Sequence, residues 1–232
     1  MQKILCKVQK VVPLTASVMH VELMPEKKCD YHAGQYLQIL MSDSDKRPFS
    51  IANAPRPDGS LELHIGSDPA NKYASQVLQK LQSEPHVEAE IGLGKAFLRT
   101  DKIKPTILLA GGTGFSYTLA ILQKLLASPL KEPVFMYWGT RTKEDMYAFD
   151  LLTELAQQHA KFKFVPVIEY PPAGWKGKTA WVHKAVLSDF TSLSSYQVYV
   201  AGRFEMAGVV REEFHRQGLS LDNLYGDAYE FI

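Results

Sequence analysis

The alternation of apolar and polar residues over the first hundred positions predicts a domain of short β-strands. Six segments show this alternation or carry strand-forming residues between Gly/Pro turns, at residues 3–12, 17–24, 35–41, 49–53, 61–66 and 86–92. Residues 71–82 instead have the apolar spacing of a helix, formed by Tyr73, Val77, Leu78 and Leu81. Short strands joined by turns favour a small closed antiparallel β-barrel, because closure leaves no exposed sheet edge.

The pattern changes near residues 101–105, where strand and helix segments begin to alternate. Four apolar strand segments are each followed by a segment of helical length, as the pairs 106–112 with 113–128, 133–139 with 142–159, 162–170 with 179–190, and 196–202 with 204–218. This alternation is typical of a doubly wound α/β fold with a parallel sheet. We therefore predict two domains, an antiparallel β-barrel over residues 1–101 and an α/β domain over residues 102–232.

The charge of the chain argues against a nucleic-acid-binding or membrane-surface protein. Its 232 residues include 26 Lys and Arg against 25 Asp and Glu, without a block of like charge, whereas both classes need a concentrated basic face. No apolar run approaches the roughly 18–20 residues that span a bilayer. The first residues also lack the apolar core of a signal peptide. These features predict a soluble cytoplasmic protein that binds neither nucleic acid nor membranes.

Metal and disulfide sites have little support in the sequence. The only cysteines are Cys6 and Cys29, and the seven histidines are scattered without HxxH or HExxH spacing. We therefore predict no metal site and no disulfide framework. Two cysteines are also too few for a fused iron–sulfur module.

The segment Arg47-Pro48-Phe49-Ser50 presents a cation, a kink, an aromatic ring and a hydroxyl in four residues. A proline cannot donate a hydrogen bond to a sheet, so it belongs on an edge strand, at a bulge or at a strand start. The segment is therefore either an irregular strand entry or a surface shaped for a ligand.

Three predicted strands of the second half end in turns that contain glycine. The first ends at Gly111-Gly112-Thr113-Gly114-Phe115, the second is followed by Arg141, and the fourth by Gly202-Arg203. Glycines let the backbone approach a phosphate, and the next helix offers free N–H groups to it. The same glycines also suit a tight turn without a ligand, since GGTG is not the GxGxxG fingerprint. Because ligands of open α/β sheets bind beyond the carboxyl ends of the strands, the three ends together favour a nucleotide site.

Six short motifs occur along the chain in a specific order. They are RPFS at residues 47–50, HIG at 64–66, AGGTGFSY at 110–117, YWGTR at 137–141, AGRFEM at 201–206 and YGDAYEFI at 225–232. In this order they resemble the ferredoxin-NADP reductase superfamily over essentially the whole chain. Within it, the chain resembles the NAD(P)H:flavin oxidoreductases (flavin reductases) of enteric and marine bacteria, including the type associated with bioluminescence. The resemblance implies a flavin-binding β-barrel followed by an NAD(P)-binding α/β domain.

The resemblance places the flavin against the strand that contains Arg47, Pro48, Phe49 and Ser50. Phe49 and the backbone around Pro48 would form a flat wall for the isoalloxazine ring. Ser50 would hydrogen-bond flavin N5 and is the expected catalytic residue, while Arg47 would face the ribityl or phosphate end.

The resemblance also implies further contributors to the flavin site. His64, Ile65 and Gly66 would line the ribityl side. Tyr36 and Tyr73 would add to the site, and an ordinary core or rim position is the alternative for both rings.

The nucleotide site implied by the resemblance lies in the second half. Residues 111–115 would receive NAD(P)H, Arg141 would touch its ribose, and Gly202-Arg203 would lie near the nicotinamide. Asp227 and Phe231 resemble a tail that closes over the flavin. Helix packing or a sheet-edge position is the alternative for this tail.

Two departures from the family pattern bear on function. Relatives that hold FAD permanently have a Gly/Ser-rich helix start that grips the pyrophosphate, whereas this chain has Asp68 and Pro69 there. Asp68 would repel a phosphate and Pro69 removes one donor N–H, so we expect the flavin to be a weakly held substrate. Ala201 stands where many electron-transferring relatives have a cysteine, which removes any thiol beside the nicotinamide.

The expected activity is direct hydride transfer from C4 of NADH or NADPH to N5 of riboflavin, FMN or FAD. The reduced flavin would then diffuse to an acceptor such as ferric iron, oxygen, a luciferase or a monooxygenase. Two alternatives remain open. One is a flavoprotein with bound FAD that passes electrons to a protein partner, and the other is a nucleotide-binding subunit that catalyses nothing.

Overall fold

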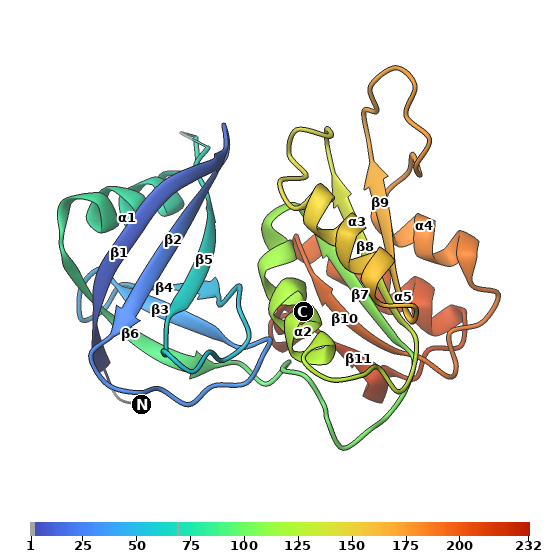
Figure 1. Ribbon diagram of the computed structural model, residues 1–232, viewed down its shortest axis with the longest axis horizontal. Coiled ribbons are helices and arrows are strands. Elements are labelled where there is room, and N and C mark those ends of the chain that lie inside the picture. Colours follow the sequence, from blue (N-terminus) through green and yellow to red (C-terminus); the bar gives the residue numbers. More distant parts are fainter. Residues whose placement is uncertain (1–2, 69) are drawn as a thin grey trace. The chain divides into compact units, whose positions relative to one another are not determined.

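The computed structural model describes residues 3–68 and 70–232 of the chain (Figure 1). The chain forms two compact units, Met1–Leu98 with Leu119–Lys124, and Arg99–Thr118 with Leu125–Ile232. The predicted domain boundary between residues 101 and 102 stays a prediction.

The first unit is built on an antiparallel sheet of six strands. In chain order they are β1 (Lys3–Thr15), β2 (Val18–Pro25), β3 (Tyr36–Leu40), β4 (Lys46–Ser50), β5 (Leu61–Gly66) and β6 (His86–Leu93). Their order in the sheet is β4-β3-β6-β1-β2-β5. Apolar residues alternate along each strand, and those of β5, Leu61, Leu63 and Ile65, are fully buried in the core. The predicted antiparallel class is confirmed.

Strand β4 differs from the predicted segment 49–53. It comprises Lys46–Ser50 and ends before Ile51, so Pro48 lies inside the strand. Pro48 stands opposite Gln38 of β3, and β4 is the last strand of the sheet. An edge strand tolerates a proline because one side of its backbone has no partner strand. Of the three positions that the sequence allowed for Pro48, an edge strand, a bulge or a strand start, the structure has the edge strand.

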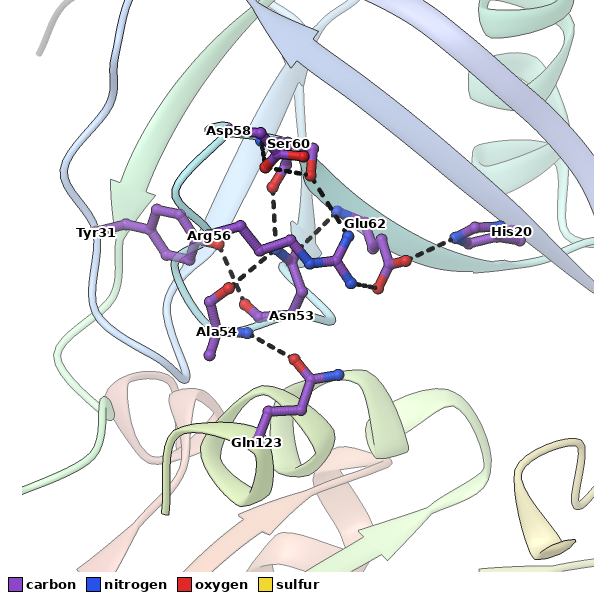
Figure 2. A network of polar contacts seen from close by, with 9 residues as sticks. All are labelled: His20, Tyr31, Asn53, Ala54, Arg56, Asp58, Ser60, Glu62 and Gln123. Atoms are coloured by element: carbon purple, nitrogen blue, oxygen red, sulfur yellow. Dashed lines mark hydrogen bonds and ion pairs between the residues drawn. The ribbon is translucent and has the colours of Figure 1, made fainter. Parts of the chain in front are cut away.

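The turn after β4 is fastened to β5 by the buried side chain of Asn53 (Figure 2). Asn53 Oδ1 accepts a hydrogen bond from the Glu62 N–H at 2.7 Å, and Nδ2 donates to the Ser60 carbonyl at 2.9 Å. Ala52 N donates to the Glu62 carbonyl at 2.7 Å, and the Tyr31 hydroxyl donates to the Asn53 carbonyl. These bonds connect the end of β4 to β5, the two outermost strands of the sheet, which do not pair with each other through backbone hydrogen bonds of a β-ladder.

The one helix predicted in this half is α1 (Lys72–Ser83), which lies beside β1 in Figure 1. Its start is capped by Asn71, whose Oδ1 accepts a hydrogen bond from Ala74 N. The helix buries Ala74, Val77, Leu78 and Leu81. Tyr73 was expected among the apolar residues of this face, but its side chain is 46% exposed because it precedes the buried stripe by one position.

The second unit is built on a parallel sheet of five strands. They are β7 (Thr106–Gly111), β8 (Val134–Thr140), β9 (Phe162–Ile168), β10 (Gln197–Ala201) and β11 (Leu224–Tyr225). The order β11-β10-β7-β8-β9 places the first strand of this unit inside the sheet. The chain proceeds in one direction to β9 and then returns to the other side of β7. The strand order therefore reverses between β7 and β10, and the predicted doubly wound class is confirmed.

The helices of this unit follow the predicted alternation. They are α2 (Phe115–Leu126), α3 (Phe149–Gln158), α4 (Val182–Asp189) and α5 (Phe204–Arg216), with short 3-10 turns η1 (Gly112–Gly114), η2 (Leu221–Asn223) and η3 (Asp227–Glu230). Within α2, Leu119–Lys124 belong to the first unit. Helices α4 and α5 cover one face of the sheet through Val186, Val210 and Phe214. Figure 1 shows α3 on the other face. In the described part of the chain, no helix is long and apolar enough to cross a membrane.

Helix α3 is shorter than the predicted segment 142–159. Residues before Phe149 form a turn instead, in which the Thr142 backbone N–H and hydroxyl both bond Asp145 Oδ2. Threonine and aspartate satisfy each other locally here, which competes with helix formation. Strand β11 was not predicted, because two residues show no periodicity.

Candidate functional site

Strand β4 presents two different faces. Arg47 and Phe49 stand opposite Ile39 and Leu37 of β3, which are fully buried in the core. Residues opposite one another in an antiparallel ladder point to the same face. Phe49 accordingly packs against the core of the first unit. The Phe49 side chain is half-buried, so a flat ligand would meet only the part of it that the core leaves uncovered.

The outer face of β4 carries Pro48 and Ser50. Pro48 is exposed and Ser50 is half-buried, opposite Tyr36 of β3. The Ser50 hydroxyl has no hydrogen-bond partner among the described residues. It is therefore available to a ligand on this face, beside the Tyr36 side chain.

The Arg47 guanidinium is already occupied. Its Nε and Nη2 donate to the Asp45 carboxylate at 3.0 and 2.6 Å, and Nη1 donates to the Tyr73 carbonyl at 2.6 Å. The guanidinium carbon also lies 4.7 Å from the centroid of the Tyr73 ring. Arg47 thus ties β4 to the start of α1, and to bind a phosphate it would have to leave Asp45. One face of the Tyr73 ring contacts the Arg47 guanidinium and so helps to connect β4 with α1.

The end of β5 holds His64, Ile65 and Gly66. The Ile65 side chain is fully buried, so it offers a ligand only its backbone. His64 stands opposite His20 of β2, and burial lowers its pKa to about 4, so its ring is neutral at pH 7. A Cβ atom on Gly66 would meet nothing within 4 Å. The open space on this strand therefore lies at Gly66.

The start of α1 lacks the features of a phosphate grip. Asp68 is exposed there, and its Oδ1 accepts a hydrogen bond from Ala70 N. Asn71 occupies the capping position and bonds Ala74 N, one of the N–H groups that an anion would otherwise use. Pro69 lies outside the described residues. The Asp68 carboxylate and the capping side chain of Asn71 thus lie where an anion would need hydrogen-bond donors.

Three glycines of the second unit meet at the point where the strand order reverses. A Cβ atom on Gly114 would lie 2.4 Å from the Ala201 carbonyl oxygen, so only glycine fits between η1 and the end of β10. Cβ atoms on Gly111 and Gly202 would lie 3.0 and 2.5 Å from the Met206 thioether. The geometry of these glycines is therefore explained by packing of the chain against itself.

Gly112 and Thr113 are the exposed members of this loop. Gly112 has φ +54°, and a Cβ atom there would meet nothing within 4 Å. Its carbonyl accepts a hydrogen bond from Trp138 Nε1 at 3.0 Å, which fixes the loop to β8. A ligand at this loop would contact these two residues.

Phe115 belongs to the interior. Its ring is fully buried and stacks on Trp138, with centroids 3.9 Å apart and planes 10° apart. Tyr147 packs edge-on against both rings, and its ring centroid lies 5.6 Å from that of Phe115 and 5.1 Å from that of Trp138. The Phe115 N–H bonds carbonyls of the preceding turn. Phe115 thus supports the loop from below and offers a ligand little of its own.

Arg141 and Arg203 are exposed cations at the ends of two strands. Arg141 follows β8, and its guanidinium carbon lies 6.0 Å from the centroid of the Tyr170 ring. Arg203 stands just before α5, and neither residue has an ion-pair partner within the described ranges. Both can therefore bind an anion on this edge.

The C-terminal tail carries Asp227 and Phe231. Asp227 Oδ1 is buried and has no hydrogen-bond partner among the described residues. Burial, with a smaller contribution from Glu230, raises the pKa of Asp227 to about 7. Phe231 is 71% exposed and packs edge-on against Phe204, with centroids 6.1 Å apart.

Comparisons with known proteins identify the family of the chain. Residues 108–212 match the family of oxidoreductase NAD-binding domains. The chain is 43% identical to an NAD(P)H-flavin reductase of Vibrio harveyi and 42% identical to one of Aliivibrio fischeri, covering 98% of both chains in each case. The chain belongs to the NAD(P)H-flavin reductase family. Its fold is also that of a ferredoxin NADP+ reductase from Neisseria gonorrhoeae, with a TM-score of 0.83 at 16% identity over 97% of this chain and 98% of that one.

In this flavin reductase chain the predicted residues form two groups. Tyr36, Pro48 and Ser50 share the outer face of β3 and β4 in the first unit. Gly111, Gly114 and Gly202 meet in the second unit. Arg141 stands apart from the glycines, at the end of the neighbouring strand β8.

Three residues that shape these groups were not predicted. Met206 fills the space beside Gly111 and Gly202, Trp138 anchors the loop at Gly112, and Asn53 fixes the turn after Ser50. Their signals in the sequence are weak, because a methionine in a helix and a tryptophan in an apolar strand are ordinary core residues. Over the described ranges, no group of three or more His, Cys, Asp or Glu could hold a metal ion.

Proposed function

We propose that the protein transfers a hydride from NADH or NADPH to free riboflavin, FMN or FAD and releases the reduced flavin. Identity of 43% over 98% of the chain to a protein named NAD(P)H-flavin reductase is the observation that carries this proposal. Bound together, nicotinamide and flavin supply the redox chemistry, with hydride passing from C4 to N5. The residues of this chain supply position and hydrogen bonds.

Ser50 is the proposed catalytic residue. Its hydroxyl stands on the outer face of β4 with no partner among the described residues. A hydroxyl at this place can donate to flavin N5 and orient the ring, which favours the charge distribution that develops during transfer. Asn53 and its bonds to β5 hold the end of this strand in place.

The nucleotide is proposed to bind at the Gly112–Thr113 loop and at Arg203. The backbone of this loop is exposed and glycine allows close approach of a phosphate. Arg203 places a positive charge beside Gly202, at the point where the strand order reverses. Gly111, Gly114 and Phe115 are proposed to support this loop from within.

A free flavin is favoured over a permanently bound FAD by the start of α1. Asp68 and the Asn71 cap stand where a bound FAD would need phosphate donors. Arg47 is committed to Asp45 and Tyr73 and adds no free charge. The flavin is therefore held mainly through its ring, whichever tail it carries.

The activity is proposed to take place in the cytoplasm, where NAD(P)H is available. Reduced flavin would reach its acceptor by diffusion, and a luciferase or a monooxygenase is the proposed kind of consumer. No complex with that consumer is required by this scheme.

The test is NADH and NADPH oxidation by the dialysed protein, with and without added riboflavin. Riboflavin has no phosphate, so turnover that depends on its addition would support recognition of a free flavin ring. Equal turnover with another acceptor and no added flavin would indicate retained FAD and electron transfer to a partner. Nucleotide binding without oxidation in any condition would leave a non-catalytic subunit and overturn the proposal.

A further inference from the structure

The chain segments next to Tyr36 and Ser50 are fastened to one another. Tyr36 is the first residue of β3, Ser50 is the last residue of β4, and the two stand opposite each other in the ladder. Just beyond this pair, Ile51 N donates to the Gln35 carbonyl at 3.1 Å. The pair is thus the last step of the β3–β4 ladder, so its position depends on the two segments that continue beyond it.

Helix α2 packs against the segment that precedes Tyr36. A Cβ atom on Gly34 would lie 3.1 Å from Ile121 Cδ1 of this helix, and Gly34 has φ +99°, a conformation that favours glycine. The Ile121 side chain is fully buried, and Leu119–Lys124 of α2 belong to the same compact unit as β3 and β4. The side of the ladder that begins at Tyr36 is therefore held by an apolar contact.

The same helix holds the segment after Ser50 through a polar side chain. Gln123 Oε1 accepts a hydrogen bond from Ala54 N at 3.0 Å, and Figure 2 shows the amide reaching from the helix to this turn. Ala54 precedes Pro55, which has no backbone N–H. The Ala54 N–H is therefore the last backbone donor of the segment before the chain turns at Pro55.

The bond to Gln123 differs from the other bonds of this segment. Ile51 N and Ala52 N donate to backbone carbonyls, which the fold supplies whatever side chains are present, whereas Ala54 N depends on a side chain. The neighbouring residue of the helix, Leu122, is apolar and fully buried, so packing alone does not require a polar residue at the next position. The hydrogen bond to the turn accounts for the glutamine.

We propose that Gln123 is a positioning residue for flavin reduction, which acts through Ala54 on the direction of the Ser50 hydroxyl. The inference rests on the proposed function, because Ser50 is the residue proposed to bond flavin N5. The side chains between Ser50 and Ala54 are fully buried, so a shift at Ala54 is transmitted along a closely packed segment. Hydride transfer is sensitive to such shifts, since its rate depends on the orientation of the reacting groups.

The first test measures kcat with riboflavin for Gln123→Met, which keeps the length of the side chain and removes the acceptor. The value should fall about 2- to 10-fold, the range for loss of one hydrogen bond, and by no more than in Ser50→Ala. Gln123→Glu keeps an acceptor and should restore kcat to within about twofold of the parent. Gln158→Met makes the same change at an exposed glutamine of α3 and should leave kcat unchanged. An unaltered kcat in Gln123→Met would overturn the proposal, even if the variant is less stable.

The second test is a double-mutant cycle between Gln123 and Ser50. In a Ser50→Ala protein, Gln123→Met should change kcat by less than about twofold, because the hydroxyl that it positions is gone. An equal loss of kcat with and without the Ser50 hydroxyl would show that Gln123 acts on another part of the protein, and would overturn the proposal.

The third test follows the Ala54 amide in the protein without ligand. Hydrogen exchange at Ala54 should be faster in Gln123→Met than in the parent, Gln123→Glu and Gln158→Met. The same exchange rate in all four proteins would overturn the proposal, because the bond would not hold the turn. Faster exchange in Gln123→Met of a protein that does not reduce flavin would overturn the proposed activity and keep Gln123 as the residue that fixes this turn.

Discussion

A Cβ atom on Gly114 would lie 2.4 Å from the carbonyl oxygen of Ala201. The turn η1, which precedes α2, is therefore packed directly on the end of β10, backbone against backbone. Beside it, Met206 fills the space that side chains on Gly111 and Gly202 would need. The point of strand-order reversal is thus a tightly packed structure in its own right, independent of any ligand.

This packing predicts a graded response to glycine substitution. Gly114→Ala meets backbone that cannot move and should lower the free energy of unfolding by about 3 kcal/mol. Gly202→Ala meets only the flexible Met206 side chain and should cost about 1 kcal/mol. Urea denaturation of the two variants measures the difference. Equal losses would show that Met206 is as rigid as the backbone.

Replacement of Ser50 should separate activity from stability. Ser50→Ala should reduce turnover with riboflavin about 10- to 100-fold through loss of one hydrogen-bond donor, while the free energy of unfolding stays within about 0.5 kcal/mol of the parent. Ser50→Thr keeps a hydroxyl on a strand position and serves as the matched control. Full turnover in the alanine variant would contradict a catalytic role for this hydroxyl.

The pKa of Asp227 predicts a dependence of stability on pH. Its folded-state pKa is raised from 3.8 to about 7, so the folded protein holds a proton that the unfolded chain releases. Stability should therefore fall as pH rises from about 4 to about 7, by at most about 1.4 kcal/mol per pH unit from this group. Asp227→Asn should flatten that slope in urea denaturation. Exposed Asp222→Asn is the control, and a slope that Asp227→Asn leaves unchanged would argue against a raised pKa.

The hydrogen bonds of the buried Asn53 side chain predict a large loss of stability when this amide is removed. Asn53→Ala leaves the Ser60 carbonyl and the Glu62 N–H without their partner and should lower the free energy of unfolding by about 2–4 kcal/mol. The Arg56 side chain is partly exposed and forms an ion pair with Glu62. Arg56→Ala should therefore lower the free energy of unfolding by no more than about 1 kcal/mol. Comparable losses for both would indicate that the contribution of Asn53 does not come from its buried bonds.

Asp68 predicts a difference among flavins. Asp68→Asn removes a negative charge at the start of α1 and should tighten FMN and FAD binding several-fold by lowering repulsion of their phosphates. Riboflavin has no phosphate, so its affinity should stay the same. Fluorescence titration with the three flavins provides the measurement, and an equal gain for riboflavin would contradict the electrostatic explanation.

The sequence predicted the fold well where periodicity carries information. The β/α alternation and five of the six strands of the first unit were predicted from their repeating pattern, whereas the predicted segment 49–53 overlaps β4 only at Phe49 and Ser50. The predicted start of α3 was wrong, since local bonds of Thr142 and Asp145 override helical propensity. The two residues of β11 are too few to form a pattern.

The sequence selects the residues of the candidate site but does not show the direction of their side chains. The sequence does not show that Arg47 is paired with Asp45, or that Phe115 stacks beneath the loop on Trp138. The pairing of Arg47 depends on which face of β4 its side chain occupies. The stacking of Phe115 depends on a contact with another element, strand β8.

The proline at the centre of β4 also bears on how the protein behaves in a crowded solution. A ligand that lies on an edge strand requires that strand to stay uncovered, and an uncovered edge can recruit strands from other molecules. Pro48 denies an incoming strand one hydrogen bond, because proline has no backbone N–H and β4 is the last strand of the sheet. This residue of the proposed flavin surface thereby also protects the molecule from edge-to-edge aggregation.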